Sequence, residues 1–167
     1  IDELKIQLIT VDTLPTVTTA FGHSALRIYI GKQFEENDYY IDFGEYDESA
    51  GFIWRFLKGE AKFYITAKSM ALAYTEWDKT GRGMYASEFI LDSNQKKVFL
   101  KNLLELIQKY KDGYEYDNFS GNCVTFIRDL VGATYGNPLT LETEKNRRTW
   151  RQRVIPYSNK IFWLRIE

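Results

Sequence analysis

Residues 21–43 read FGHSALRIYIGKQFEENDYYIDF, two apolar stretches separated by a polar turn. Ser24–Ile30 and Tyr39–Phe43 are rich in β-branched and aromatic residues, which favour strands. The connection between them is short, so we expect an antiparallel pair. A turn centred near residue 34 places residue 26 opposite residue 42 or a close neighbour. We take this hairpin as the centre of the predicted fold.

Further elements are predicted on both sides of the hairpin. Leu4–Val11 alternates apolar and polar residues as a half-buried strand does, and Phe63–Thr66 and Met84–Leu91 are shorter strand candidates. Helices are expected over Ser49–Lys58, after a cap at Asp92 or Ser93, and from Asn122 to about Val131, whereas Lys68–Lys79 is ambiguous. Strands precede helices along the chain, which favours an α+β fold with a mostly antiparallel sheet packed against helices over a doubly wound one.

Apolar periodicity predicts which faces of these helices are buried. The expected buried residues are Val98, Leu100, Leu103, Leu104, Leu106 and Ile107 in the long helix, and Val124, Ile127, Leu130 and Val131 in the next one. A loop is predicted over 132–138, followed by a basic amphipathic helix over Leu139–Val154 and an apolar end over Ile161–Leu164. The arginines of that basic segment would face solvent or contact anionic lipid headgroups.

Composition narrows the class of protein. The chain has 167 residues, typical of one domain, and we treat 1–167 as a single domain. A net charge of -1 gives no support for nucleic-acid binding. No apolar run approaches the roughly 20 residues that span a bilayer. One cysteine and one histidine cannot form the usual zinc site, and no phosphate-binding glycine loop is present, so we expect neither a metal nor a cofactor.

Cys123 is the strongest candidate for chemistry. It directly follows Asn122, a favourable N-cap residue, and Gly121, so it is predicted to lie at the first position of a helix. The backbone N–H groups and the dipole at a helix N-terminus favour an anion, and a thiol is a nucleophile only as its thiolate. Amide groups near Gly121 and Asn122 could also hold an oxyanion. The alternative is a structural cysteine that acts as a small apolar residue.

His23 is the only histidine, so a thiol–imidazole pair in this chain requires His23 and Cys123. A third group should accept a hydrogen bond from the imidazole and orient it. The predicted hairpin brings Asp42 near His23, with Glu45 and Asp47 as competing carboxylates. The alternative is a structural histidine beside an ordinary carboxylate at a strand end.

These residues resemble a known family. Phe21–Ile28, Asp42-Phe43-Gly44, Phe56–Gly59 with Tyr64, and Asn122–Thr125 with Ile127–Leu130 together resemble the Lnb N-terminal periplasmic domain family. The resemblance implies a circularly permuted papain-like, NlpC-type fold, in which the histidine strand precedes the cysteine helix. It also implies Cys123 as the acylated nucleophile and His23 as its base, in a periplasmic or otherwise extracytoplasmic protein. Contact with a membrane surface is a further expectation for such a protein.

The resemblance implies acyl transfer through a cysteine thioester, with a bacterial lipoprotein or lipid ester as substrate. A second reading is an amidase or peptidase that cuts cell-wall peptides, and a third is a lipid- or protein-binding module without catalysis. In the enzymatic readings, Cys123, His23 and Asp42 are the predicted catalytic residues. Supporting roles are expected for Asn122, Gly121 and Ser24, and substrate contacts for Arg27, Tyr116 and Asp117.

Overall fold

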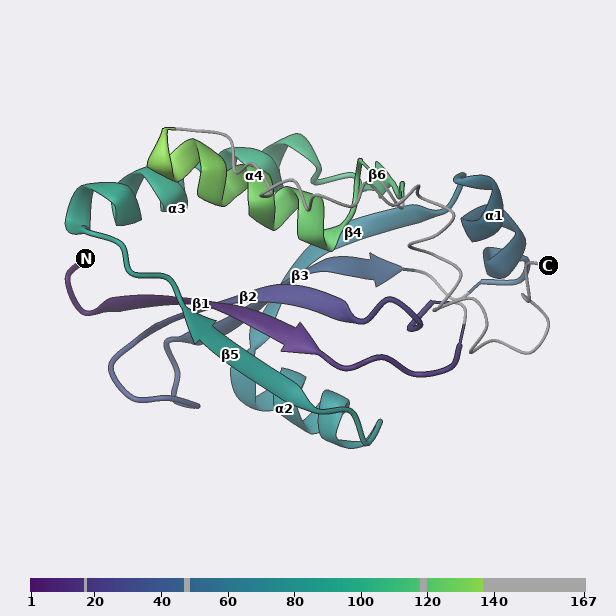
Figure 1. Ribbon diagram of the computed structural model, residues 1–167, viewed down its shortest axis with the longest axis horizontal. Helices are drawn as coiled ribbons and strands as arrows, with labels where there is room; N and C mark the ends of the chain where they lie inside the picture. The colour runs from purple at the N-terminus through teal and green to yellow at the C-terminus, as the bar shows by residue number, and fades with distance from the viewer. Residues whose placement is uncertain (17, 47–48, 118–119, 137–167) are drawn as a thin grey trace, which may run out of the picture.

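A computed structural model describes residues 1–16, 18–46, 49–117 and 120–136, which form one antiparallel sheet and four helices (Figure 1). The sheet has six strands in the order β5-β1-β2-β3-β4-β6. The strands are β1 (Leu4–Val11), β2 (His23–Ile30), β3 (Asp38–Tyr46), β4 (Lys62–Ser69), β5 (Met84–Glu88) and β6 (Tyr114–Glu115). The helices are α1 (Phe52–Lys58), α2 (Met70–Asp78), α3 (Ser93–Lys109) and α4 (Cys123–Tyr135). The α+β class and the antiparallel sheet are therefore confirmed.

The central hairpin forms as predicted, with the register displaced by one residue. Asp42 lies opposite Ala25, where the sequence placed it opposite residue 26. Arg27 and Asp38 hold the hairpin together, because Nε and Nη2 of the guanidinium donate to the two carboxylate oxygens at 2.8 and 2.5 Å. Asp38 also accepts from the amide of Phe34 in the turn at 2.6 Å. One buried carboxylate thus fixes both the strand pair and its turn.

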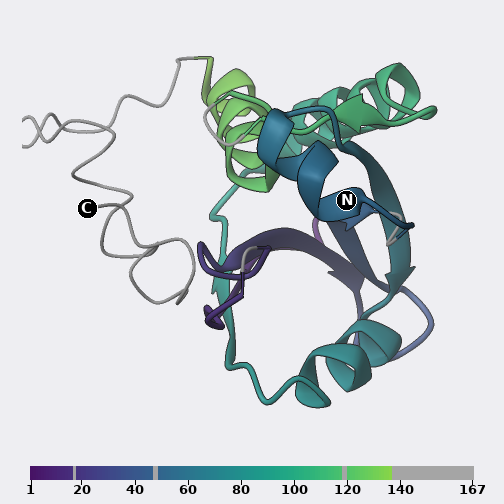
Figure 2. The same cartoon turned by 90° about the vertical axis from the view of Figure 1, so that its right-hand side faces the viewer.

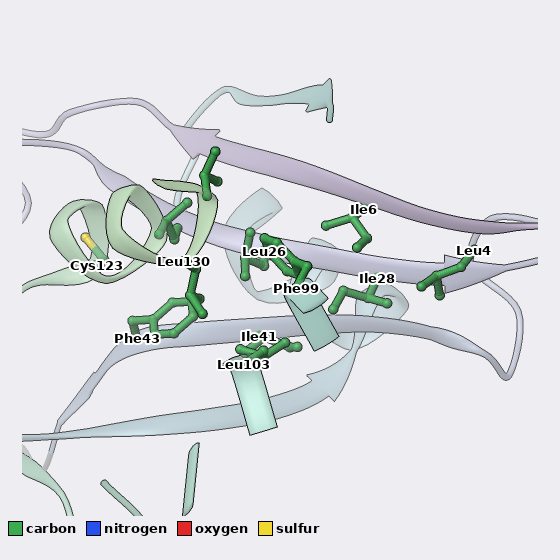
Figure 3. Close-up of a cluster of buried hydrophobic side chains, with 12 residues drawn as sticks. Leu4, Ile6, Leu26, Ile28, Ile41, Phe43, Phe99, Leu103, Cys123 and Leu130 are labelled. Carbon is green, nitrogen blue, oxygen red and sulfur yellow. The ribbon is translucent and has the colours of Figure 1, made fainter. Parts of the chain in front are cut away.

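Helices cover both faces of the sheet (Figures 1 and 2). On one face, strand residues pack against α3 and α4 in the largest hydrophobic cluster (Figure 3). Its buried members are Leu4, Ile6, Leu26, Ile28, Ile41, Phe43, Phe99, Leu103, Cys123, Ile127, Leu130 and Val131. On the other face, Ile9, Val11, Ala25 and Tyr40 pack against Met70 and Ala73 of α2. Leu26 and Ala25 belong to different clusters because neighbouring side chains in a strand point to opposite faces.

The buried face of α3 matches the predicted stripe in part, since the predicted Leu100, Leu106 and Ile107 are half-buried against the core. Leu103 is buried as predicted, but Val98 and Leu104 are 41% and 65% exposed. The residue that fills the core is Phe99, which is fully buried and lies one helical turn before Leu103. The prediction centred the stripe on the many leucines, whereas the sheet selects the face that carries the larger aromatic ring.

The last described helix is longer than predicted. It continues to Tyr135 and ends at Gly136, which adopts the left-handed conformation with φ of 72°. The predicted loop from residue 132 is therefore wrong up to this point, because Gly132 is buried inside the helix. Val124 was expected to face inward but is 57% exposed, while Ile127, Leu130 and Val131 are buried as predicted. The segments predicted over Leu139–Val154 and Ile161–Leu164 lie outside the described residues.

A third cluster lies between α1 and the sheet and explains much of the aromatic content. Phe52 and Phe56 of α1 pack on Phe63 and Tyr114, with Tyr46, Tyr110, Tyr116 and Phe126 around them. The short strand β6, which the sequence did not reveal, pairs Glu115 with Lys62 of β4. This pairing directs the following residues toward the start of α4. None of the helices within the described residues is both long and apolar enough to cross a membrane.

Candidate active site

Cys123 is the first residue of α4, and the turn before it is held by a capping box. Asn122 Oδ1 accepts from the amides of Val124 and Thr125 at 3.1 and 3.0 Å. In return, Thr125 Oγ1 accepts from the amide of Asn122 at 2.9 Å. The box fixes where the helix begins, so it also fixes where the thiol lies. The sulfur therefore lies at the positive end of the helix dipole.

The capping turn uses most of the polar groups predicted to support an oxyanion. The amide of Gly121 donates to the carbonyl of Asp117 at 3.2 Å, and Asn122 Nδ2 donates to the same carbonyl at 3.1 Å. The amide of Cys123 itself has no hydrogen-bond partner among the described residues. Among these groups, the Cys123 amide is therefore the one best placed to donate to a negative oxygen.

His23 and Asp42 form a buried pair at the adjoining ends of β2 and β3. The Nε2 atom of His23 lies 3.1 Å from Oδ1 of Asp42, and the two side chains are 13% and 7% exposed. The N–H direction misses the oxygen, so the contact is an ion pair rather than a linear hydrogen bond. Oδ1 of Asp42 also accepts from the amide of Gly44 at 2.6 Å. The carboxylate is thereby anchored to the backbone while it contacts the imidazole.

The electrostatics of this pair favour a charged imidazole. Burial acts most strongly on His23 and lowers its pKa, but the negative charge of Asp42 and the polar contact with Cys123 outweigh it. The pKa of His23 is raised from 6.5 to about 10. Burial likewise raises the pKa of Asp42, yet the imidazolium and the Gly44 amide outweigh burial and keep that pKa below its usual range. At neutral pH the site therefore holds an imidazolium next to a carboxylate and a sulfur.

One cleft of about 430 Å³ contains all three predicted catalytic residues. Cys123 lies at one end of the hydrophobic cluster that also contains Phe43 and Leu130 (Figure 3), and it is 7% exposed. Phe56, Phe63 and Tyr116 form an aromatic part of the cleft wall, whereas other lining residues are charged. The charged lining residues besides His23 and Asp42 are Glu45, Lys68, Glu76 and Arg82.

Trp77, on the helix α2, restrains the imidazole of His23 by ring stacking. Its ring stacks on His23 with the ring centroids 5.4 Å apart and the planes inclined by 28°. The indole Nε1 donates to the hydroxyl of the buried Tyr40 at 3.1 Å, which sets the position of the indole. The imidazole is thus restrained by a ring stack and by Asp42, a combination that holds one rotamer ready for proton transfer.

Of the other predicted site residues, one lines the cleft and the others do not. Tyr116 lines the cleft, and burial raises the pKa of its phenol, so its hydroxyl stays protonated and able to donate. Ser24 follows His23 along β2, so its side chain points to the opposite face of the sheet. Arg27 is 4% exposed in its pair with Asp38, away from the cleft. Asp117 Oδ1 accepts from the amide and hydroxyl of Ser120 at 2.6 and 2.8 Å, within the turn before α4.

Of the competing carboxylates, Glu45 lines the cleft but lies 3.5 Å from Lys68, and Asp47 is outside the described residues. Sequence reasoning missed Gly44, Trp77 and Arg82. The quoted motif Asp42-Phe43-Gly44 contained a signal for Gly44, because a Cβ there would lie 2.8 Å from His23 Cε1. Trp77 belongs to the stretch Lys68–Lys79, whose secondary structure was ambiguous, and Arg82 follows that stretch. Nothing in the local sequence linked either residue to the histidine.

These features define the class of protein as an α+β domain whose antiparallel sheet presents a His–Asp pair to a cysteine at a helix N-terminus. The chain belongs to the Lnb N-terminal periplasmic domain family, which it matches over residues 1–155. The family is named as a periplasmic domain, in agreement with the expected extracytoplasmic location. No curated protein and no solved structure matches the chain.

Proposed function

We propose that this protein is a cysteine-dependent acyltransferase or hydrolase that carries the acyl group as a thioester on Cys123. The observation that supports this most is that Cys123 and the His23–Asp42 pair line one cleft. A strand that bears the histidine before a helix that bears the cysteine also fits the circularly permuted papain-like arrangement implied by the resemblance. That fold assignment is part of the proposal.

The proposed reaction has two half-reactions. The thiolate of Cys123 attacks the carbonyl carbon of an ester or amide, and the developing negative oxygen accepts from the Cys123 amide. The imidazolium of His23 gives its proton to the leaving alcohol or amine as the bond to carbon breaks. In the second half, neutral His23 removes a proton from the acceptor amine or from water, which attacks the thioester and restores the thiolate.

Two substrate classes agree with different parts of the cleft. The aromatic wall of Phe56, Phe63 and Tyr116 supports an acyl chain, as a lipoprotein or lipid ester would supply. The charged wall of Glu45, Lys68 and Glu76 supports a polar substrate such as a cell-wall peptide. The periplasmic name of the family agrees with both substrates. We place acyl transfer from an ester first, and amide hydrolysis second.

Intact mass spectrometry tests the proposal directly. Because Cys123 is the only cysteine, an acyl adduct that hydroxylamine removes would identify its thioester. The protein is incubated separately with a diacylated lipopeptide, an activated 4-nitrophenyl ester and a muropeptide mixture. We expect an adduct with the wild type, none with Cys123→Ala, and strongly delayed formation with His23→Gln. The substrate that acylates fastest separates the two enzymatic readings.

A folded wild-type protein that forms no adduct with any of these substrates would reject the enzymatic proposal. The rate of Cys123 alkylation by iodoacetamide against pH then tests the third reading. A profile like that of a free thiol, unchanged in His23→Gln, would favour a binding module that uses the same fold.

A further inference from the structure

Arg82 is a buried cation that has no counter-ion among the described residues. The residue is 8% exposed, and its enclosed Nη2 atom has no hydrogen-bond partner in the part of the chain that the structure describes. Its Nε donates to the backbone carbonyl of Asp12 at 2.5 Å. Among the described residues, no carboxylate lies within ion-pair distance of this guanidinium. The Asp12 carboxylate acts on it only from a distance and accepts from the Tyr85 hydroxyl at 3.3 Å.

Two other cationic side chains of this protein, Arg27 and Lys68, are paired with carboxylates. Arg27, which is also buried, donates to both carboxylate oxygens of Asp38. Lys68, in the wall of the cleft, lies 2.7 Å from Glu76 and 3.5 Å from Glu45. A buried charge is costly unless it is paired and hydrogen-bonded. Arg82 therefore differs from both, because its Nη2 group has no partner among the described residues.

The position of Arg82 connects it with the candidate active site. It lines the same cleft as His23 and Cys123. Its guanidinium carbon lies 4.8 Å from the centroid of the Trp77 ring, the ring that also stacks on His23. The hydrogen bond from Trp77 to Tyr40 fixes that indole in turn. The guanidinium is thus held at a set place relative to the imidazole, with one indole ring in contact with both.

We propose that Arg82 binds a carboxylate on the substrate, several bonds away from the carbonyl carbon that Cys123 attacks. This inference rests on the proposed function and narrows its substrates to acyl compounds that also carry a free carboxylate. A guanidinium offers N–H donors that suit a carboxylate, and among the described residues only the Nε group of Arg82 donates to a protein atom. A phosphate dianion would meet stronger repulsion from Glu45 and Glu76, which line the same cleft. We therefore assign the carboxylate.

A pair of activated esters that differ only in this group provides the test. The substrates are mono-4-nitrophenyl adipate, with a free carboxylate, and its methyl ester, which is neutral. Wild type should acylate faster with the carboxylate form, by about 10- to 100-fold in kcat/KM, the usual worth of a hydrogen-bonded charge. Arg82→Met should abolish that ratio, and Arg82→Lys should retain only part of it. Lys101→Met removes an exposed cation on α3 and should retain the wild-type ratio.

Binding without chemistry separates failure of this inference from failure of the proposed function. In Cys123→Ala, monomethyl adipate should shift the indole N–H signal of Trp77, and Arg82→Met should abolish the saturable shift. Phosphate and methyl phosphate serve as the competing anions. If the half-ester binds in this way while wild type forms no thioester, the carboxylate-binding role of Arg82 is supported and the enzymatic proposal is rejected.

Three results would overturn the inference. Equal losses for both esters in Arg82→Met would make Arg82 a support for Trp77 and His23 only. Absence of a carboxylate preference in wild type would mean that water satisfies the buried donors. Stronger saturable binding of methyl phosphate than of the carboxylate would assign the site to a phosphorylated substrate instead.

Discussion

At the scale of single residues, the candidate site depends on one position that has no side chain. A Cβ at Gly44 would lie 2.8 Å from Cε1 of His23 and 3.3 Å from Oδ1 of Asp42. Real Cβ atoms do not approach other atoms as closely as the first of these distances, so the imidazole would have to move. The imidazole is already confined on another side by Trp77. The residue after Phe43 therefore controls the geometry of the His–Asp pair.

Gly44→Ala should consequently slow thioester formation on Cys123 by roughly tenfold or more, because small misplacements of a catalytic group are costly. Single-turnover acylation followed by mass spectrometry measures the rate. Gly121→Ala is the matched control, since a Cβ at that position has ordinary contacts of 3.6 Å and more. Acylation of Gly44→Ala at the wild-type rate would show that the imidazole does not need its present position.

Some residues of the candidate site could be predicted from the sequence, and others could not. Asp42 was found because hairpin pairing is local, and an error of one residue in register still left it beside His23. Arg27 was assigned to the substrate, yet Asp38, on the neighbouring strand, binds it in the core. Trp77, whose ring contacts both His23 and Arg82, reaches the imidazole only because α2 packs on the opposite face of the sheet from α3 and α4. Packing between a helix and a sheet that are distant in the chain produces no recognisable pattern in the local sequence.

At the scale of elements, the start of α4 determines where the nucleophile lies. Asn122 and Asp92 are equivalent N-caps, each in a complete capping box, but only Asn122 precedes the thiol. The sequence predicted Asn122 as one cap and gave Asp92 and Ser93 as alternatives for the other, because capping is a local rule. It included Leu103 in the buried face of α3 but missed Phe99, because the shape of the sheet determines which ring fills the core. Local capping preferences were thus enough to predict the position of the nucleophile in its helix. The packing of the core around it depends on contacts between distant parts of the chain, which the local sequence does not reveal.

The two caps form a matched pair for experiment. Asn122→Ala and Asp92→Ala should each lower the free energy of unfolding by about 1 kcal/mol, the usual cost of a lost cap. Urea denaturation measures both. Only Asn122→Ala should also slow Cys123 acylation, because only this variant loosens the turn that positions the sulfur. Equal acylation rates in the two variants would show that the thiol is positioned independently of its cap.

At the scale of the whole molecule, the buried pair links the stability of the fold to pH. The folded pKa of His23 is about 10 and its ordinary value is 6.5. The stabilisation from its charged form is therefore complete below pH 6.5 and declines as pH rises through 10. Asp42 acts in the opposite direction, since its lowered pKa gives stabilisation that is lost as pH falls below its usual range. The two contributions overlap in mildly acidic solution.

We therefore expect the stability advantage of wild type over Asp42→Asn to be largest at mildly acidic pH. It should shrink between pH 6.5 and 10, by at most about 1.4 kcal/mol per pH unit, because folding retains one proton that the unfolded chain releases. Without the carboxylate, burial is largely unopposed and the pKa of His23 falls. Since His23 is the only histidine, its imidazole NMR signals report this pKa directly in untagged protein. Parallel stability curves from pH 5.5 to 10, with an imidazole that titrates near 6.5 in wild type, would mean that Asp42 does not hold His23 in its charged form, so that the imidazole is mostly neutral at neutral pH and the resting site contains no ion pair.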